Sequence, residues 1–294
     1  MDDLRNIAKI FTLPLDFINK YFKVFVFLTI LALILASGDE SEVSSEANLA
    51  KLYLNTPIFE SESFQAQIER IRKQPNIKGV LLVINSPGGA VGASIEIADM
   101  IRELNEELPT IAYVQGSMAS GSYYAGMYAS EIYANRGALI GSIGVIFSGV
   151  NIKELMDKVG IKEQGIKAGE YKEVGTMSRE WSEKERAFLD ALLHEQYEMF
   201  YTDVIKARGK KLKSIEPSEF AEGKIFSAQG ALELGLIDKV GTMGEAIEAL
   251  MLKSGVKEPV WLKRDKLETY LEKILDEASM KLFSHALPSL KMSL

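Results

Sequence analysis

The sequence predicts an α/β protein with a mostly parallel sheet, forming one large domain behind an apolar N-terminal segment. Segments typical of strands alternate with segments typical of helices from about residue 50 onward. One strand candidate, residues 79–84 (GVLLVI), is apolar without interruption. A continuous apolar run is typical of a strand covered on both faces, as in parallel sheets whose strands are joined by crossover helices.

The composition indicates a globular protein and excludes several kinds of site. The chain has 294 residues, of which 47% are hydrophobic and 26% charged, enough to bury a substantial core. Its net charge of −7 and its lack of long basic runs argue against a nucleic-acid partner. There are no cysteines, which excludes disulfides, thiolate metal sites and a cysteine nucleophile. We expect neither a metal nor a cofactor.

The N-terminal apolar segment runs from Val24 to Ala36, with Lys20 and Lys23 before it and acidic residues after it. Extended to residue 38, it approaches the length of a membrane span. We expect a single-pass anchor at residues 24–38, with residues 1–23 in the cytoplasm and the rest outside it. A cleaved signal peptide and a buried helix are the alternatives. Residues 39–49 are acidic and serine-rich, as expected of a linker.

The expected elements follow in order along the domain. Pro109 ends one helix, and the box Ser182 to Glu185 caps the start of the longest one. The C-terminal tail, residues 256–294, contains an amphipathic stretch that favours a helix. The strand candidates are residues 51–55, 79–84, 110–114 and 131–134, and the helix candidates are residues 63–73, 94–108 and 182–207.

The loop after the apolar strand reads NSPGG, residues 85–89. Adjacent glycines can adopt positive φ and turn their N–H groups outward, and beside a helix N-terminus such groups attract negative charge. Taken alone, the loop is more typical of an ordinary strand-to-helix turn.

A second loop, residues 116–126 (GSMASGSYYAG), sets three serines among small residues directly after a strand. Small neighbours leave room for a substrate carbonyl, so the stretch is suited to a nucleophile. We favour Ser120 over Ser117 and Ser122, because Gly121 follows it with an unhindered N–H. That N–H and those of Gly88 and Gly89 could face one point and form an oxyanion hole.

The proton acceptor is harder to find. His194 falls within the long helix and His285 within the tail, so a Ser-His-Asp triad is disfavoured. A lysine can serve as the base when burial keeps its amine neutral. Lys172 lies in a glycine-flanked stretch with no helical pattern, although from these residues alone a surface lysine paired with Glu170 or Glu173 is the favoured explanation.

Together these motifs resemble the signal peptide peptidases of the SppA family, in their half-length, single-copy form. The resemblance covers about residues 50 to 250 and implies a ClpP/crotonase-like fold of repeated ββα units. It also implies a Ser–Lys protease domain at residues 50–255, anchored in the bacterial inner membrane with this domain on the extracytoplasmic side. The resemblance further implies that the substrates are remnant signal peptides and other unfolded peptides. The motifs are residues 84–89 (INSPGG), 117–124 (SMASGSYY), 140–145 (IGSIGV), 169–173 (GEYKE) and 223–238.

The resemblance assigns a role to each matching residue. Ser120 is the nucleophile and Lys172 the base, Gly89 and Gly121 donate to the oxyanion, and Ser142 orients the lysine amine. In this family the half-length proteins form closed homo-oligomeric rings, in which serine and lysine come from neighbouring protomers.

The chain departs from the family at one position. Ser122 stands where the family more usually has glycine, and we expect its side chain to narrow the mouth of the cleft.

Three other functions use related features. Stomatin-associated membrane proteases share the Ser-Pro-Gly-Gly motif and the Ser–Lys pair, but usually carry further hydrophobic spans. Crotonase-like enzymes of acyl-CoA chemistry also use glycine-rich oxyanion loops, but are cytosolic and lack an anchor. A catalytically silent oligomeric scaffold is the third alternative.

Overall fold

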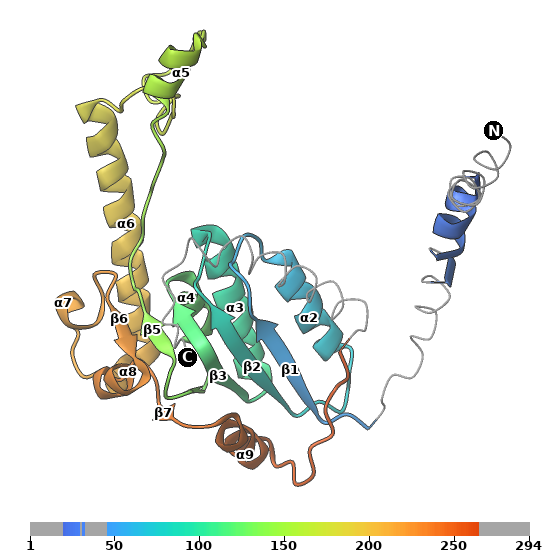
Figure 1. The fold of residues 1–294 in the computed structure, drawn as a ribbon. Coiled ribbons are helices and arrows are strands. Elements are labelled where there is room, and N and C mark those ends of the chain that lie inside the picture. The colour runs from blue at the N-terminus through green and yellow to red at the C-terminus, as the bar shows by residue number, and fades with distance from the viewer. Residues whose placement is uncertain (1–19, 30, 33–45, 265–294) are drawn as a thin grey trace, which may run out of the picture. The chain divides into compact units, whose positions relative to one another are not determined.

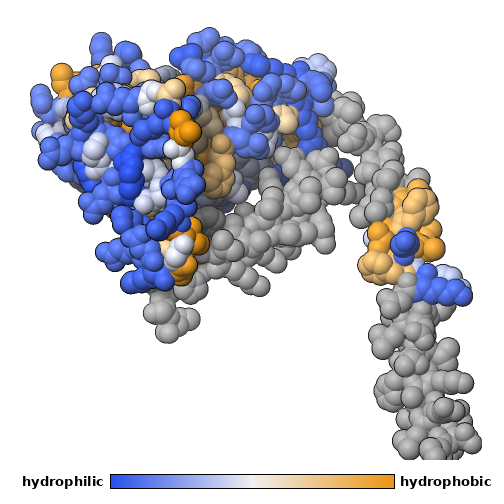
Figure 2. Space-filling view, turned by 90° about the horizontal axis from the view of Figure 1, so that it is seen from above, coloured by the Kyte–Doolittle hydropathy of each residue, from blue (hydrophilic) through white to orange (hydrophobic). Residues whose placement is uncertain are grey.

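The computed structural model describes residues 20–29, 31–32 and 46–264 of the chain. Residues 46–262 form one compact unit. The described residues 20–29 and 31–32 are helical and carry the apolar side chains of the expected anchor (Figure 2). Residue 30 and residues 33–38 of that anchor lie outside the described residues, as do residues 1–19, residues 39–45 of the linker and residues 265–294 of the tail. No helix in the described ranges has both the length and the apolar character needed to cross a membrane.

A mostly parallel sheet forms the centre of the compact unit (Figure 1), which confirms the predicted α/β class. Its order is β1-β2-β3-β4-β7, all parallel. A short strand, β5, pairs in parallel with the end of β3, and β6 pairs with β5 in the antiparallel sense. The strands are β1 (Leu49–Leu54), β2 (Gly79–Ser86), β3 (Thr110–Ala119), β4 (Glu131–Ala134), β5 (Leu139–Gly141), β6 (Ile225–Ser227) and β7 (Lys239–Val240).

The strand β3 pairs with two strands on the same side. It pairs with β4 over residues 111–114 and with β5 over residues 117–119. The chain alternates single strands with single helices from β1 to β4, so this part of the chain does not show the repeated ββα units that the resemblance implied. The expected end of this strand at Val114 is wrong by five residues, and Ser117 lies within the strand rather than beyond it.

Helices cover both faces of the sheet, as the unbroken apolar run of β2 predicted. Val80, Leu82 and Ile84 face a core shared with α2 (Glu62–Arg72) and α3 (Val91–Glu107). Leu81 and Val83 face a second core shared with α9 (Met243–Ser254). Side chains alternate across a strand, so both faces of β2 must be apolar. Three shorter helices complete this part: α4 (Gly121–Gly126), α7 (Pro217–Phe220) and α8 (Ala228–Leu234).

The longest helix, α6 (Glu183–Arg208), has 26 residues and is about 39 Å long at 1.5 Å per residue. The predicted capping box is confirmed: the Ser182 hydroxyl accepts from the Glu185 N–H, and the Glu185 carboxylate accepts from the Ser182 N–H. The C-terminal half buries Phe200 and Val204 against the sheet domain, and a 3₁₀ turn (Gly209–Lys211) follows.

An arm, residues 146–181, connects the region after β5 to α6. It contains α5 (Lys153–Val159), and it extends along α6 toward the N-terminal end of that helix (Figure 1). Contacts with α6 fix it there: among them, the Tyr171 ring stacks on Phe188 with centroids 4.8 Å apart, and the Lys184 ammonium lies 2.8 Å from the Glu170 carboxylate. The arm therefore runs beside the first turns of α6.

Candidate active site

Ser120 lies at the junction of β3 and α4, in a backbone conformation that serine rarely adopts. Its φ is 52° and its ψ is −126°. Positive φ costs a non-glycine residue conformational energy, and such residues cluster at functional sites. Hydrogen bonds hold the turn in place: the Ser120 N–H donates to the Gly141 carbonyl at 2.8 Å, and the Ser120 carbonyl accepts from Tyr123 and Tyr124. The turn presents the Ser120 side chain to a pocket.

The glycine loop and the serine turn approach each other at backbone distance. A Cβ on Gly88, whose φ is 92°, would lie 2.5 Å from the Gly121 nitrogen. A Cβ on Gly121 would lie 3.2 Å from the Gly89 nitrogen and 2.2 Å from the Ser94 hydroxyl. Only glycine fits at either position without displacing its neighbours.

The N–H groups of Gly89 and Gly121 are free of the usual backbone partners. Gly121 is the first residue of α4, and the first N–H groups of a helix have no intrahelical acceptor. Gly89 forms a bridge with Ile58, but its two hydrogen bonds use the Gly88 carbonyl and the Ala90 N–H. The Gly89 N–H points to the opposite side of this extended segment. Two adjacent amides beside a serine can stabilise a developing oxyanion.

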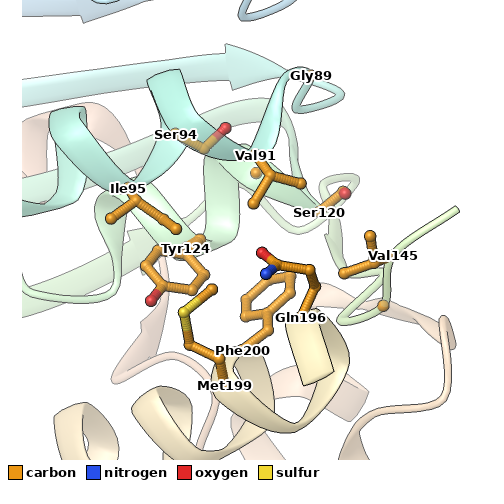
Figure 3. Close-up of a pocket in the computed structure, with 12 residues that line it drawn as sticks. Gly89, Val91, Ser94, Ile95, Ser120, Tyr124, Val145, Gln196, Met199 and Phe200 are labelled. Carbon is orange, nitrogen blue, oxygen red and sulfur yellow. The ribbon is translucent and has the colours of Figure 1, made fainter. Parts of the chain in front are cut away.

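The pocket next to Ser120 is small and mainly apolar (Figure 3). Its volume is about 20 Å³, little more than one water-sized group. One wall is the start of α3, and the facing wall is the middle of α6, from which the Gln196 amide extends into the pocket. The lining side chains that sequence reasoning missed come from these walls and from α4 and the chain after β5: Val91, Ile95, Tyr124, Val145, Gln196, Met199 and Phe200.

Tyr124 ties this pocket to α6. Its hydroxyl donates to the Asp203 carboxylate, and its ring packs against Phe200 with centroids 4.8 Å apart. Burial and the neighbouring Asp203 carboxylate raise the pKa of the Tyr124 hydroxyl far above its ordinary value, so the hydroxyl remains protonated. No sequence signal linked Tyr124 to a residue 79 positions away.

Ser142 follows β5 directly and also has positive φ, 50°. Its N–H donates to the Lys224 carbonyl at 2.6 Å, while the preceding carbonyl, that of Gly141, accepts from Ser120. The structure thus brings Ser120, Ser142 and the two glycine amides into one neighbourhood. The roles expected for them remain predictions.

Lys172 lies elsewhere in the chain. It is exposed, in a turn of the arm where its N–H donates to the Gly169 carbonyl, and it does not line the Ser120 pocket. The glutamates considered as its partners are paired with other cations: Glu170 with Lys184, and Glu173 with Lys167. In the described part of the chain, the Lys172 ammonium has no hydrogen bond or ion pair.

The distance from Lys172 to the pocket follows from α6. Tyr171 packs on Phe188, whereas the pocket meets α6 at Gln196, eight residues further along. Eight residues of helix span about 12 Å. The structure therefore does not bring Lys172 and Ser120 together within one chain.

The described histidine does not offer an alternative base. His194 is exposed on α6, where its ring nitrogen lies 2.8 Å from the Asp190 carbonyl oxygen, and it does not line the pocket. This agrees with its expected position on the helix surface. His285 lies outside the described residues. The described ranges also contain no cluster of three or more metal-ligating side chains.

The structure contradicts the expectation for the Ser122 side chain. It does not narrow the cleft mouth, because its side chain is fully buried and takes no part in lining the pocket. Its hydroxyl instead accepts from the Ala119 N–H at 2.8 Å and lies 2.7 Å from the Ser86 carbonyl. The sequence showed the unusual serine but not the direction of its side chain.

A buried carboxylate in the first turn of α6, that of Glu185, binds the end of the arm. Arg179 forms two hydrogen bonds with Glu185, at 2.8 and 2.7 Å, next to the capping contacts of Ser182. The guanidinium and the Ser182 N–H lower the pKa of Glu185 to about 2. The carboxylate therefore stays charged at neutral pH and holds the end of the arm to the first turn of α6.

The mostly parallel sheet and the Ser120 turn fit one class of protein, the serine hydrolases. The model of the Clp protease family matches residues 47–140. The model of peptidase family S49 matches residues 102–257, which is more than half of the chain. The chain belongs to peptidase family S49, a family of serine proteases. This confirms the SppA-like family recognised in the sequence motifs.

The chain is similar to proteins of several different organisms. A protein of Methanocaldococcus jannaschii named as a protease is 32% identical over 246 residues, which cover 79% of this chain and 78% of that protein. A protein of Enterococcus faecium named as signal peptide peptidase SppA is 31% identical over 65% of this chain and 56% of its own length. The chloroplastic serine protease SPPA of Arabidopsis thaliana is 30% identical over 77% of this chain and 32% of its own length. Among solved structures, a ClpP1 mutant from Listeria monocytogenes matches with a TM-score of 0.47 and 15% identity, over 67% of this chain and 94% of that one.

Proposed function

We propose that this chain is a membrane-anchored serine endopeptidase in which Ser120 attacks the substrate and Lys172 of a neighbouring copy serves as the base. One observation carries the proposal: Ser120 occupies a positive-φ turn at a pocket, beside the amides of Gly89 and Gly121. Membership of peptidase family S49 supplies the reaction type, hydrolysis of a peptide bond.

The reaction proceeds through an acyl-enzyme. The neutral amine of Lys172 accepts the proton of the Ser120 hydroxyl as its oxygen bonds to the peptide carbonyl carbon. The carbonyl oxygen becomes an oxyanion, which accepts hydrogen bonds from the Gly89 and Gly121 amides. The C–N bond then breaks, and Lys172 returns the proton to the leaving amine. Water next attacks the acyl-enzyme by the same route, with Lys172 as the base and Ser120 as the leaving group.

Features of the arm favour a base that is supplied by another copy of the chain. Lys172 is exposed and unpaired there, and it stands about 12 Å along α6 from the pocket of its own chain. The surface around it is apolar, as expected of a surface that a partner covers. Within the compact unit, the exposed apolar side chains of the surface around Lys172 include Ile146, Phe147, Val150, Leu155, Val159, Ile161, Ile166, Tyr171 and Met177 on the arm and Phe188 and Leu192 on α6.

A closed homo-oligomer fits this surface, because a head-to-tail contact repeated around a ring covers every arm. In such a ring Ser142, beside the Ser120 turn, faces the incoming amine and orients it. Enclosed active sites admit unfolded peptides and exclude folded proteins. A monomer holding Ser120 without a base is inactive.

The pocket indicates the substrate class. A cavity of about 20 Å³ accepts a small side chain such as alanine or serine immediately before the cleaved bond. Its apolar walls suit segments from the cores of signal peptides. We propose that remnant signal peptides and other unfolded peptides are the substrates.

Membrane anchoring completes the proposal. The apolar run from Val24 to Ala36, with lysines before it and acidic residues after it, supports a single-pass anchor with the catalytic domain on the extracytoplasmic side of the bacterial inner membrane. An anchored peptidase meets its substrates where signal peptides remain after cleavage.

A fluorophosphonate probe tests the nucleophile. The full chain, purified in detergent, is treated with the probe alongside Ser120→Ala, with Ser117→Ala as the matched control because Ser117 belongs to the same strand end. We expect labelling and peptide hydrolysis in the wild type and in Ser117→Ala, and neither in Ser120→Ala. Unchanged labelling of Ser120→Ala would remove the nucleophile from the proposal.

A further inference from the structure

Ser122 is a buried polar residue without a role in the mechanism described so far. It is the second residue of α4, and none of its surface is exposed. Its hydroxyl accepts from the Ala119 N–H at 2.8 Å and lies 2.7 Å from the Ser86 carbonyl and 2.9 Å from that of Ala119. A hydroxyl has one proton, so it donates to one of these carbonyls at a time.

These bonds join the two loops that supply the oxyanion amides. Ala119 immediately precedes Ser120 and Gly121, while Ser86 begins the loop that leads to Gly89. The link continues beyond Ser122, because the Ser86 hydroxyl accepts from the Gly88 N–H at 3.2 Å and donates to the Thr56 carbonyl at 2.7 Å.

The link lies where the sheet itself is irregular. The pairing of β2 with β3 shifts register between Ile84 and Ser86, so that Ser86 pairs with Met118. The regular ladder is therefore interrupted between Ile84 and Ser86, and only the Ser86–Met118 pair follows the interruption. A side chain that bonds to both strand ends adds to this single pair in fixing their spacing.

We propose that Ser122 is a positioning residue of the oxyanion hole, whose hydroxyl fixes the separation of the Gly89 and Gly121 amides. The proposal rests on the function proposed above. Ser122 cannot act by touching the substrate, since it is fully buried and does not line the pocket. It acts through the backbone of residues 119–121 and 86–89.

The test is Ser122→Ala in the full chain, with Ser130→Ala as the matched control. The Ser130 hydroxyl also donates to a backbone carbonyl, that of Thr110 at 2.9 Å, but at the opposite end of β3. Turnover of a fluorogenic peptide is measured per serine titrated with fluorophosphonate, so that inactive molecules do not count. Affinity for a peptide aldehyde, which forms a tetrahedral adduct with the serine, is measured in parallel.

In Ser122→Ala we expect kcat to fall about 10- to 100-fold with KM within about threefold, because a misplacement of roughly 1 Å in an active site has that effect. Affinity for the aldehyde should fall by the same factor, since its oxyanion uses the same two amides. Ser130→Ala should retain kcat, KM and aldehyde affinity.

Two outcomes would contradict the role of Ser122 and leave the proposed function intact. One is a kcat of Ser122→Ala within twofold of the kcat of Ser130→Ala. The other is a raised KM of Ser122→Ala with an unchanged kcat. If Ser122→Ala does not fold, Ser122→Cys replaces it, because a thiol fills the site but bonds weakly. The kcat of Ser122→Cys must then also fall below that of the wild type, and an unchanged kcat contradicts the inference. Hydrolysis that persists in Ser120→Ala overturns the proposed function as well, which separates the two failures.

Discussion

Replacing Gly121 with alanine tests the oxyanion geometry with the addition of a single methyl group. Its Cβ would lie 2.2 Å from the Ser94 hydroxyl, about 1.2 Å short of the 3.4 Å at which ordinary contact begins. The Ser94 hydroxyl can rotate away, but its own Cβ at 3.0 Å and the Gly89 nitrogen at 3.2 Å remain too close. The Gly121 amide must therefore move away from the Gly89 amide.

A shift of roughly 1 Å in a catalytic group lowers the rate about 100-fold, equal to about 2.7 kcal/mol of transition-state stabilisation. We expect that loss in kcat/KM for a fluorogenic peptide. The double variant Gly121→Ala, Ser94→Gly lacks both the hydroxyl and the Cβ of residue 94 that crowd the new methyl group, and should regain about tenfold.

Gly92→Ala is the matched control, because a Cβ there meets no atom within 4 Å at the exposed start of α3. It should keep full activity and gain up to about 1 kcal/mol of stability from helix propensity. The thermal unfolding of every variant is measured, because it distinguishes a loss of folding from a displacement of the Gly121 amide in a folded protein. A kcat/KM of Gly121→Ala within threefold of the wild type would refute the oxyanion assignment.

Three further changes test other parts of the account. Met199→Ala enlarges the pocket, so the ratio of kcat/KM for leucine over alanine before the cleaved bond should rise at least about tenfold; an unchanged ratio would show that this pocket does not select the substrate. Because Arg179 lowers the pKa of Glu185 to about 2, the stability contributed by this pair is complete above pH 4.5 and lost as pH falls toward 2. Glu185→Gln should therefore flatten the fall in melting temperature over that range, and equal slopes would contradict this. Lys172→Ala should abolish hydrolysis while Lys167→Ala, a matched charge change on the same arm, preserves it; activity in both would exclude Lys172 as the base.

The central fold could be read from the sequence because its elements are long and strongly patterned. The strand at residues 79–84, the helix at residues 63–73 and the capped helix at residues 182–207 were each predicted to within two residues at either end. The strands β5, β6 and β7 have only two or three residues and show no periodicity, so local sequence could not reveal them.

The start of α3 shows how tertiary contacts alter a boundary. Sequence placed it at Ser94, a good capping residue, but the helix begins at Val91. The backbone before it is fixed by the bridge between Gly89 and Ile58, and the Ser94 hydroxyl bonds to the Ala90 carbonyl within the helix. A contact between segments 31 residues apart thus replaces the local cap.

The candidate site was predictable where chemistry depends on backbone freedom. Gly89 and Gly121 stood out because only glycine permits such close approach, and Ser120 because small residues surround it. The α6 residues of the pocket carried no such signal, since apolar residues such as Met199 and Phe200 are common in any helix that packs on a core. Only the packing of α6 across the Ser120 turn gives them a role.

The most direct test of the central claim is complementation between two inactive variants. Ser120→Ala and Lys172→Ala, as full chains with different affinity tags, are co-expressed and purified through both tags. If serine and lysine come from neighbouring copies, about one quarter of the sites in a randomly mixed ring combine both intact residues, and hydrolysis returns to about that fraction of the wild-type rate. A mixed assembly as inactive as either variant alone would contradict an active site shared between copies.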